Sequence, residues 1–486
     1  TLSQKFYITN AIPYVNAALP FKQASEFVQT DALARFHRAL GEDTFYLSGA
    51  DENALKNVLA AEEAGIPVSE FVAQNTQSFE DLRTVLDLSY DYFIRTADRK
   101  RHWPGAVKLW RACDENGDIY KKEYEGLYCV GCEEFKTEKD LVNGLCPEHQ
   151  TKPELIKEEN YFFRLSKYQE ELERIIASGE YKVVSEKRKN EVLSFIRGGL
   201  EDFSVSRSVE RARGWGIPVP GDVSQVMYVW FGALANYITA LGYAEESEKF
   251  RKYWPADVHV IGKGITRFHA VYWPAMLLSA GLPLPKALFV HGYLTVGGQK
   301  ISKSLGNVID PREVGEKYGS DALRYYLLKA FSPFEDGDFS IQRLEETYNS
   351  DLANGLGNLV SRIAKLCENS GLESENYKPK ISEILSSELK EAIENFEFNH
   401  YLELVWAKIS AADRFINDQK PWELLEGDGQ QATDDRLRRI LNKLVSEVRE
   451  IAVLVEPFIP KAAAKIKEQF KEPKITSAAP LFPRIS

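Results

Sequence analysis

The sequence predicts an α/β protein whose parallel sheet is split by an insertion and followed by an all-helical bundle. Strand-like and helical apolar patterns alternate over residues 6–95 and again over residues 258–290, as expected of a parallel sheet. Residues 116–225 break this rhythm with short strand-like pieces, charged helices and three of the five cysteines. From about residue 344 onward, the apolar spacing is helical in every segment.

The first half of the sheet is predicted from short buried runs that alternate with longer helical periods. The expected elements are a strand at 6–9, a helix that ends at Gly41, a strand at 44–47, helices at 52–64 and 68–86, and a strand at 92–95. The second half brings a strand at 258–261, a helix at 267–280 and a strand at 288–290. Ligands of open parallel sheets bind beyond the carboxyl ends of the strands. The loops after residues 9, 47, 261 and 290 are therefore candidate binding loops.

These patterns divide the chain into four segments. We expect the first half of the sheet domain at residues 1–115, the insertion at 116–225, the second half at 226–342 and the helical bundle at 343–486. A chain of 486 residues is too long for one hydrophobic core, which agrees with about three domains.

Composition limits the classes of function. The chain has no apolar run long enough to span a membrane and no secretory signal layout at its start, so we expect a cytoplasmic protein. A net charge of −11 argues against indiscriminate binding of nucleic acid. Local basic strips such as Arg207, Arg211 and Arg213 remain candidates for RNA contact, and a solvated helix face is the equal alternative.

Three cysteines and a histidine have the spacing of a zinc site. Cys129 and Cys132 are separated by two residues, as are Cys146 and His149, with thirteen residues between the two pairs. This is the pattern of a tetrahedral Cys3His site built from two knuckles. A redox CxxC motif is the alternative, but it leaves Cys146 and His149 without a role.

A glycine-rich loop at residues 291–304 carries two lysines. Lys300 and Lys303 flank Ser302, and such a loop can close on a polyphosphate and neutralise the charge of leaving pyrophosphate. An ordinary surface hairpin is the alternative. The string HGYLTVGGQKISKS resembles the KMSKS loop of class I aminoacyl-tRNA synthetases, and the LGNVIDP that follows is similar to the methionyl-tRNA synthetase family. The resemblance implies catalytic roles for both lysines and Ser302, and contacts of ATP with His291, Gly292 and the lysines.

Other strings carry the same resemblance along nearly the whole chain. They are AIPYVN (11–16), SGADEN (48–53), WGIPVP (215–220), YVWFGALANY (228–237), FHAVYWPAML (268–277) and KPWELL (420–425). The resemblance implies a Rossmann-type catalytic domain that joins methionine to AMP and then to tRNA(Met), with ATP, Mg²⁺ and Zn²⁺ as its cofactors. Because the chain ends soon after the helical bundle, we expect a monomer.

The resemblance also implies a methionine site. Asp51 would meet the substrate ammonium, as a buried carboxylate should for a cation. The thioether pocket would be lined by Ile12, Tyr14, Trp230, Ala233, Tyr237 and His269. Aromatic edges hold a polarizable sulfur well. Plain core packing is the alternative for Trp230 and Tyr237.

In the helical region, the resemblance implies an anticodon-binding site. Asn358 and Arg362 lie four residues apart and hence on one helix face, and Trp422 occupies a base-stacking position. Amide and guanidinium groups can read the edges of unstacked bases, and an indole can stack on them. A capping amide, a surface arginine and a buried tryptophan are the alternatives.

The chain departs from the family where ATP should bind. By register, Pro20, Phe21, Lys22 and Gln23 occupy the HIGH signature, so Lys22 and Gln23 are the expected ATP contacts there. Gly232 and Gly264 stand where the family usually has aspartates. Two hypotheses follow: a working ligase with a divergent ATP site, or an impaired or engineered variant that binds methionine and tRNA without efficient ATP activation. ATP–pyrophosphate exchange separates them.

Overall fold

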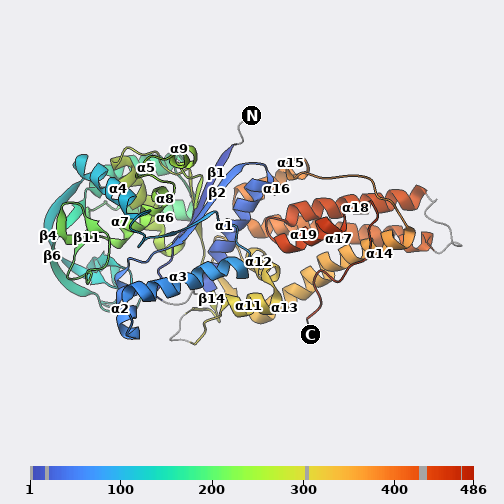
Figure 1. The fold of residues 1–486 in the computed structure, drawn as a ribbon, viewed down its shortest axis with the longest axis horizontal. Helices are drawn as coiled ribbons and strands as arrows, with labels where there is room; N and C mark the ends of the chain where they lie inside the picture. Colours follow the sequence, from blue (N-terminus) through green and yellow to red (C-terminus); the bar gives the residue numbers. More distant parts are fainter. Residues whose placement is uncertain (1–3, 17–20, 302–305, 426–434, 472, 486) are drawn as a thin grey trace.

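The computed structural model describes residues 4–16, 21–301, 306–425, 435–471 and 473–485, which form an elongated molecule (Figure 1). The amino-terminal part makes a broad α/β body, and the last helices extend away from it (Figure 1). Within these ranges, no helix is both long and apolar enough to cross a membrane. The predicted order of an α/β region followed by helices is confirmed.

Six parallel strands form the central sheet, in the order β3-β2-β1-β12-β13-β7. Their bounds are Tyr92–Arg95 (β3), Asp43–Ala50 (β2), Lys5–Asn10 (β1), Val258–Gly262 (β12), Ala287–His291 (β13) and Lys182–Val184 (β7). The chain builds outward from β1 on one side and from β12 on the other, so the strand order reverses between them. Such a switch point opens a crevice at the carboxyl ends of the strands.

The segment 116–225 supplies more than a separate insertion. It contains β7, a three-residue strand of the main sheet, flanked in sequence by helices α5 (Gln169–Ser178) and α6 (Glu186–Arg197). The rest includes an antiparallel sheet in the order β5-β4-β6-β8. Its strands are Glu134–Lys136 (β5), Ile119–Cys129 (β4), Glu154–Phe163 (β6) and Phe203–Ser204 (β8). The sequence predicts the other five strands of the main sheet but not β7, because three residues are too few for a pattern.

The two faces of the sheet belong to two hydrophobic cores, because successive residues of a strand point to opposite faces. Phe6 and Ile8 lie in the first core, and Tyr7 lies in the second. The first core includes α1 (Phe21–Ala39) and α12 (Ser320–Lys329) and continues into the helical region. The second includes α4 (Trp103–Glu115) and α10 (Trp273–Ser279).

The extended end of the molecule is helical (Figure 1), and its principal helices follow in chain order. They are α14 (Asn358–Ser370), α17 (Phe398–Gln419), α18 (Asp435–Val455) and α19 (Pro460–Gln469). Helix α18 buries Leu437, Leu441, Leu444 and Val448, a three-and-four spacing that places one apolar stripe against its neighbours. The helical prediction for this region is confirmed.

A buried ion pair joins the α/β body to this helical region. Nη1 of Arg324, on α12, lies 2.7 Å from Oδ2 of Asp31, on α1, and neither side chain is exposed. The guanidinium also donates to the carbonyls of Leu86, Pro457 and Phe458. Because Pro457 and Phe458 form the turn between α18 and α19, this arginine fixes one end of the bundle to α1.

Candidate active site

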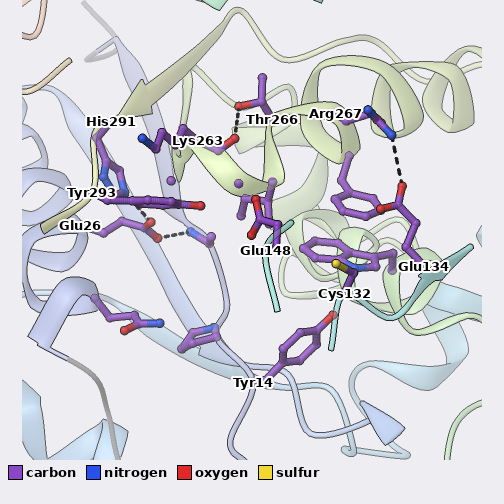
Figure 2. A pocket seen from close by; sticks show the side chains of 18 of the residues that line it. Tyr14, Glu26, Cys132, Glu134, Glu148, Lys263, Thr266, Arg267, His291 and Tyr293 are labelled. Carbon is purple, nitrogen blue, oxygen red and sulfur yellow. Dashed lines mark hydrogen bonds and ion pairs between the residues drawn. The ribbon is translucent and has the colours of Figure 1, made fainter. Parts of the chain in front are cut away.

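A pocket of about 650 Å³ opens at the switch point of the sheet (Figure 2). Its walls come from the loops after β1, β12 and β13, from α1 and from the cysteine-rich loops. Its lining includes Tyr14, Gln23, Glu26, Cys132, Glu148, His149, Trp230, Gly264, His291, Gly292 and Tyr293. Three of the four candidate binding loops of the sequence analysis therefore meet at one pocket.

A second, much smaller cavity of about 10 Å³ adjoins this pocket. It is lined by Ile12, Trp230, Ala233, Tyr237 and His269, which are five of the seven expected methionine-site residues. Ile12 and Trp230 border both spaces, and the ring of Tyr14 lies 6.2 Å from that of Trp230. Such a cavity has room for about one water molecule. An apolar side chain can enter only if the aromatic rings around it shift.

The far wall of the cavity is a hydrogen-bonded pair. Nδ1 of His269 lies 3.0 Å from the carbonyl of Ile265, so this nitrogen carries a proton and donates. The other nitrogen, Nε2, then accepts from the Tyr237 hydroxyl at 2.7 Å. Burial lowers the pKa of His269 to about 4, so the imidazole is neutral near pH 7. The wall is therefore uncharged, which suits a thioether.

Asp51 is buried beside Tyr14, with which it forms an isolated parallel bridge. Its Oδ1 accepts the backbone N–H of Asn53 at 3.1 Å and the hydroxyl of Thr96 at 3.0 Å. Burial raises the pKa of Asp51 to about 7, and the charges of Glu133 and Glu52 add to this, whereas the two hydrogen bonds oppose it. A cation bound here would restore full ionisation. The carboxylate is thus suited to an ammonium ligand.

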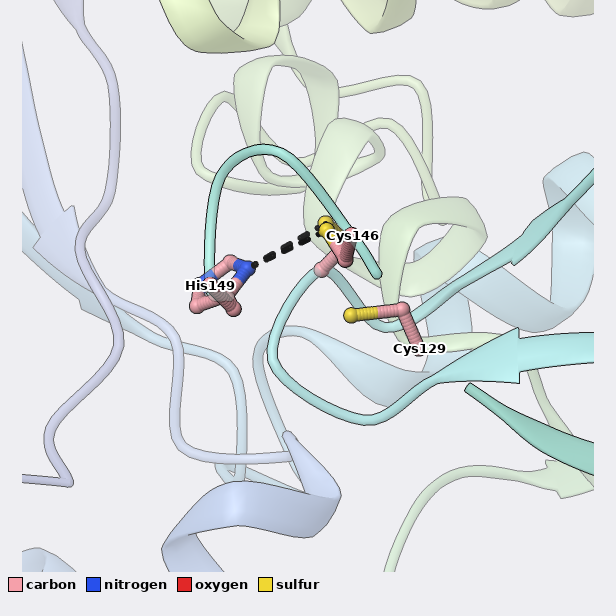
Figure 3. Close-up of side chains that lie close together, drawn as sticks. Cys129, Cys146 and His149 are labelled. Carbon is pink, nitrogen blue, oxygen red and sulfur yellow. Dashed lines mark hydrogen bonds between the residues drawn. The ribbon is translucent and has the colours of Figure 1, made fainter. Parts of the chain in front are cut away.

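The cysteine-rich loops bring the four expected zinc ligands together (Figure 3). The ligand atoms of Cys129, Cys132, Cys146 and His149 all lie within 4.8 Å of one another. Sγ of Cys132 is 3.5 Å from Sγ of Cys146 and 3.3 Å from Nδ1 of His149. These separations are too long for a disulfide, whose sulfurs lie about 2.05 Å apart. Three thiolates and an imidazole at this spacing fit a tetrahedral zinc ion.

The expected basic strip at Arg207, Arg211 and Arg213 is not one surface. Arg207 is 7% exposed, and the guanidinium carbon of Arg211 lies 3.9 Å from the ring centroid of Tyr128. Arg213 pairs with Glu62. The first two arginines stack among aromatic rings, so the prediction of a solvated or RNA-binding strip is wrong for them.

The expected anticodon residues lie at one end of the helical region. Asn358 is exposed on α14, and Arg362, one turn later, bonds to Asp413 and Asn417 on α17. Trp422 follows the end of α17 by three residues and is 37% exposed, so the alternative of a buried tryptophan is wrong. An exposed indole beside polar side chains can stack with an unpaired base.

Comparisons with known proteins agree with this geometry. The family model described as tRNA synthetases class I (M) matches residues 6–152 and 140–364. The methionine–tRNA ligase of Caldanaerobacter subterraneus subsp. tengcongensis is 42% identical over 479 residues, which cover 96% of this chain and 74% of the relative. The chain belongs to the methionine–tRNA ligase family. The resemblance found in the sequence is confirmed.

Other members of the methionine–tRNA ligase family are also similar to this chain. The Brucella suis ligase is 41% identical over 477 residues, which cover 95% of this chain and 91% of the relative. Mycobacterium tuberculosis methionyl-tRNA synthetase in complex with methionyl-adenylate matches with a TM-score of 0.91 and 37% identity, over 99% of this chain and all of that chain. The apo form of the same synthetase matches with a TM-score of 0.86 and 33% identity, over 100% of this chain and 99% of that chain.

The start of α1 is where the sequence resemblance places the HIGH signature. Phe21 is fully buried and meets the ring of Phe339 edge-on at 4.3 Å, whereas Gln23 borders the pocket. Pro20 and the side chain of Lys22 lie outside the described residues. Phe21 thus points inward and Gln23 faces the pocket, and the register proposed from the sequence stays a prediction.

Gly232 and Gly264, where the resemblance led us to expect aspartates, have different surroundings. A Cβ at position 264 would lie 2.0 Å from the hydroxyl of Tyr293, so this tyrosine occupies the room of any side chain there. The Gly264 amide donates to that hydroxyl, and burial raises the pKa of Tyr293 to about 12. A Cβ at position 232 would face Ile217 instead, at 3.0 Å, and Gly232 is not among the residues that line either cavity. Only Gly264 therefore borders the pocket.

The lysine loop is described only in part. Residues Gln299–Lys300 form β15, which pairs with β14 (Leu294–Val296) beside the pocket. Ser302, Lys303 and the side chain of Lys300 lie outside the described residues. Ile301, at the position that the resemblance aligns with the methionine of the KMSKS loop, is buried in the first core.

Glu26 is a pocket residue that the sequence analysis missed. Its Oε1 accepts the backbone N–H of Ala11 at 2.9 Å, and its Oε2 lies 2.7 Å from Nε2 of His291 (Figure 2). The carboxylate thus joins α1 to the loops after β1 and β13. In the sequence, only its position one turn after Gln23 indicates that it lies on the same side of the helix. This spacing is a weak signal, because every face of a helix repeats in the same way.

Proposed function

We propose that this chain is a methionine–tRNA ligase that uses ATP to form methionyl-adenylate and then transfers methionine to tRNA(Met). The observation that carries the proposal is a small cavity lined by aromatic rings, at the crevice of a parallel sheet, with the buried carboxylate of Asp51 bridged to Tyr14 of the adjoining pocket. The polarizable sulfur of methionine suits a cavity lined with aromatic rings. Two of the relatives named above are methionine–tRNA ligases, and a solved relative holds methionyl-adenylate.

On the amino-acid side, Asp51 would bind the ammonium of methionine. The side chain of methionine would enter the cavity, with Ile12 at the floor. Around it would lie Tyr14, Trp230, Ala233, Tyr237 and His269. The neutral Tyr237–His269 wall favours an uncharged side chain, because a buried charge would find no counter-ion there. Shape would separate methionine from its neighbours by about 1–3 kcal/mol per methylene.

On the nucleotide side, ATP would occupy the larger pocket. Lys22, Gln23, His291 and Gly292 are the proposed contacts from α1 and the loop after β13. Lys300 and Lys303, with Ser302 between them, would neutralise the charge that develops on the leaving pyrophosphate. Mg²⁺ bound to ATP would add to this neutralisation. Holding the methionine carboxylate in line with the α-phosphate is the remaining task of the pocket.

We assign Cys129, Cys132, Cys146 and His149 to a structural Zn²⁺ site. Zinc would supply a closed tetrahedral centre, and all four positions are filled by protein ligands. Cys132 and His149 also line the larger pocket, so the metal would fix one of its walls. Metal analysis of protein purified without chelator should find about one zinc per chain.

The helical region would recognise the tRNA. Asn358 and Arg362 would read base edges of the CAU anticodon, and Trp422 would stack on one of its bases. We propose the same four segments as from the sequence, except that β7 of the insertion belongs to the main sheet: the two halves of the catalytic domain at 1–115 and 226–342, the insertion at 116–225 and the anticodon-binding domain at 343–486. We expect a monomer that acts in the cytoplasm.

ATP–pyrophosphate exchange tests the proposed activation step. The full chain should exchange label into ATP when methionine is added and not when leucine is added. Asp51→Asn should lower the methionine-dependent rate, because the ammonium loses its counter-ion. Binding of methionine without exchange would favour the alternative, a methionine- and tRNA-binding protein that does not activate its amino acid.

A further inference from the structure

Thr96 follows β3 and is buried, with 1% of its surface exposed. Its hydroxyl oxygen lies 3.0 Å from Oδ1 of Asp51 and 2.8 Å from the backbone nitrogen of Glu52. The Glu52 nitrogen is a donor, so the threonine oxygen accepts there. The hydroxyl proton is then free for Asp51, which makes Thr96 a donor to the carboxylate.

The position of Thr96 is fixed from its other side. Its carbonyl accepts from Nδ2 of Asn53 at 2.8 Å and from Nε1 of Trp103 at 3.0 Å. Its N–H also donates to the carbonyl of Ala50 at 3.3 Å. Thr96 therefore takes part in five described hydrogen bonds, four of which hold it still while the fifth points at Asp51. A preorganised donor stabilises a charge without the cost of reorienting when that charge forms.

The charges around Asp51 make such a donor useful. Glu52 and Glu133 both face it and disfavour its ionised form, as burial does. Arg95 pairs with Glu52 at 2.7 Å, and Nζ of Lys56 lies 4.1 Å from the ring centroid of Tyr14 while donating to the carbonyl of Gly131. The two described hydrogen bonds to the Asp51 carboxylate both come from neutral donors, namely Asn53 N–H and Thr96.

We propose that Thr96 is a positioning residue for methionine binding, whose hydroxyl keeps Asp51 ionised and turned toward the substrate ammonium. The inference rests on the proposed role of Asp51 in binding methionine. Nothing in the sequence motifs points to Thr96, because it lies 45 residues from Asp51 and meets it only through the pairing of β2 with β3.

Calorimetric titration of the full chain with methionine at several pH values tests this role. The pKa of Asp51 is raised, so its charged form is lost as pH falls through about 7, and wild-type affinity should fall with it. Thr96→Val keeps the shape of the side chain and removes the donor to Asp51. The pH at which half of the affinity is lost should therefore be higher in this variant. At pH 7 the variant should bind methionine up to about tenfold more weakly than wild type. Above pH 8 the difference in affinity between the two proteins should become smaller.

Thr96→Ser is the matched control, because it keeps the hydroxyl and should follow the wild-type pH profile. In an Asp51→Asn background, the change to valine should have little further effect, since the two residues act as one unit. A Thr96→Val protein whose affinity falls equally at all pH values, or not at all, overturns the inference. A wild-type chain that binds no methionine would overturn the proposed function as well, so the two failures are distinguishable.

Discussion

The Arg324–Asp31 pair offers a demanding test of how the α/β body is joined to the helical region. Replacing Arg324 with methionine keeps an unbranched side chain of similar length and removes the charge. It leaves the Asp31 carboxylate buried with one partner fewer, and it leaves the carbonyls of Leu86, Pro457 and Phe458 without the donors described above.

The magnitude follows from the burial of both partners. Removing one member of a fully buried ion pair costs about 3–5 kcal/mol. Arg35 also pairs with Asp31, at 2.7 Å, and Ser89 donates to it, so part of the carboxylate charge stays compensated. We therefore expect the lower end of this range, about 3 kcal/mol.

Urea unfolding near pH 7.5, followed by tryptophan fluorescence, measures the loss. Arg35→Met is the matched control, because Arg35 pairs with the same carboxylate but its side chain is 21% exposed, so water can replace part of the lost contact. Arg324→Met should shift the unfolding midpoint clearly more than Arg35→Met. Equal shifts in the two variants would refute the view that Arg324 anchors the bundle.

Four further outcomes follow from the site. Removing zinc with a chelator should loosen the wall of the pocket, so amide exchange around residues 129–149 should rise, and full protection without metal would contradict the knuckle. Trp422→Ala should weaken tRNA binding by about 1–3 kcal/mol and leave methionine affinity unchanged, as calorimetry and filter binding would show. Gly264→Asp should lower the melting temperature, and adding Tyr293→Phe should recover part of it, because the clash is with the tyrosine hydroxyl. Restoring His-Ile-Gly-His at positions 20–23 should raise exchange about 10²-fold or more, and an unchanged rate would show that the register is wrong.

Local patterns predicted most of the fold. Five strands of the main sheet and the helical end follow from apolar spacing, since a buried strand and an amphipathic helix each leave a period in the sequence. β7 could not be predicted in this way, because Lys182–Val184 is too short to show a period. It is a strand because it pairs with β13.

Contacts between distant residues were beyond sequence reasoning. Arg207 and Arg211 read as surface charges, but the strands of the insertion fold over them and stack aromatic rings on their guanidinium groups. Glu26 and Thr96 carry no motif, yet the sheet brings them to His291 and Asp51. The cysteine cluster, in contrast, could be predicted, because zinc ligands come in pairs with a short and characteristic spacing in the sequence.

Charging of tRNA with labelled methionine by the full chain tests the central claim most directly. We predict that acid-precipitable methionine accumulates only with ATP and with a tRNA that carries the CAU anticodon, and that Asp51→Asn slows it strongly. A chain that binds methionine and tRNA(Met) yet leaves the tRNA uncharged would contradict the account.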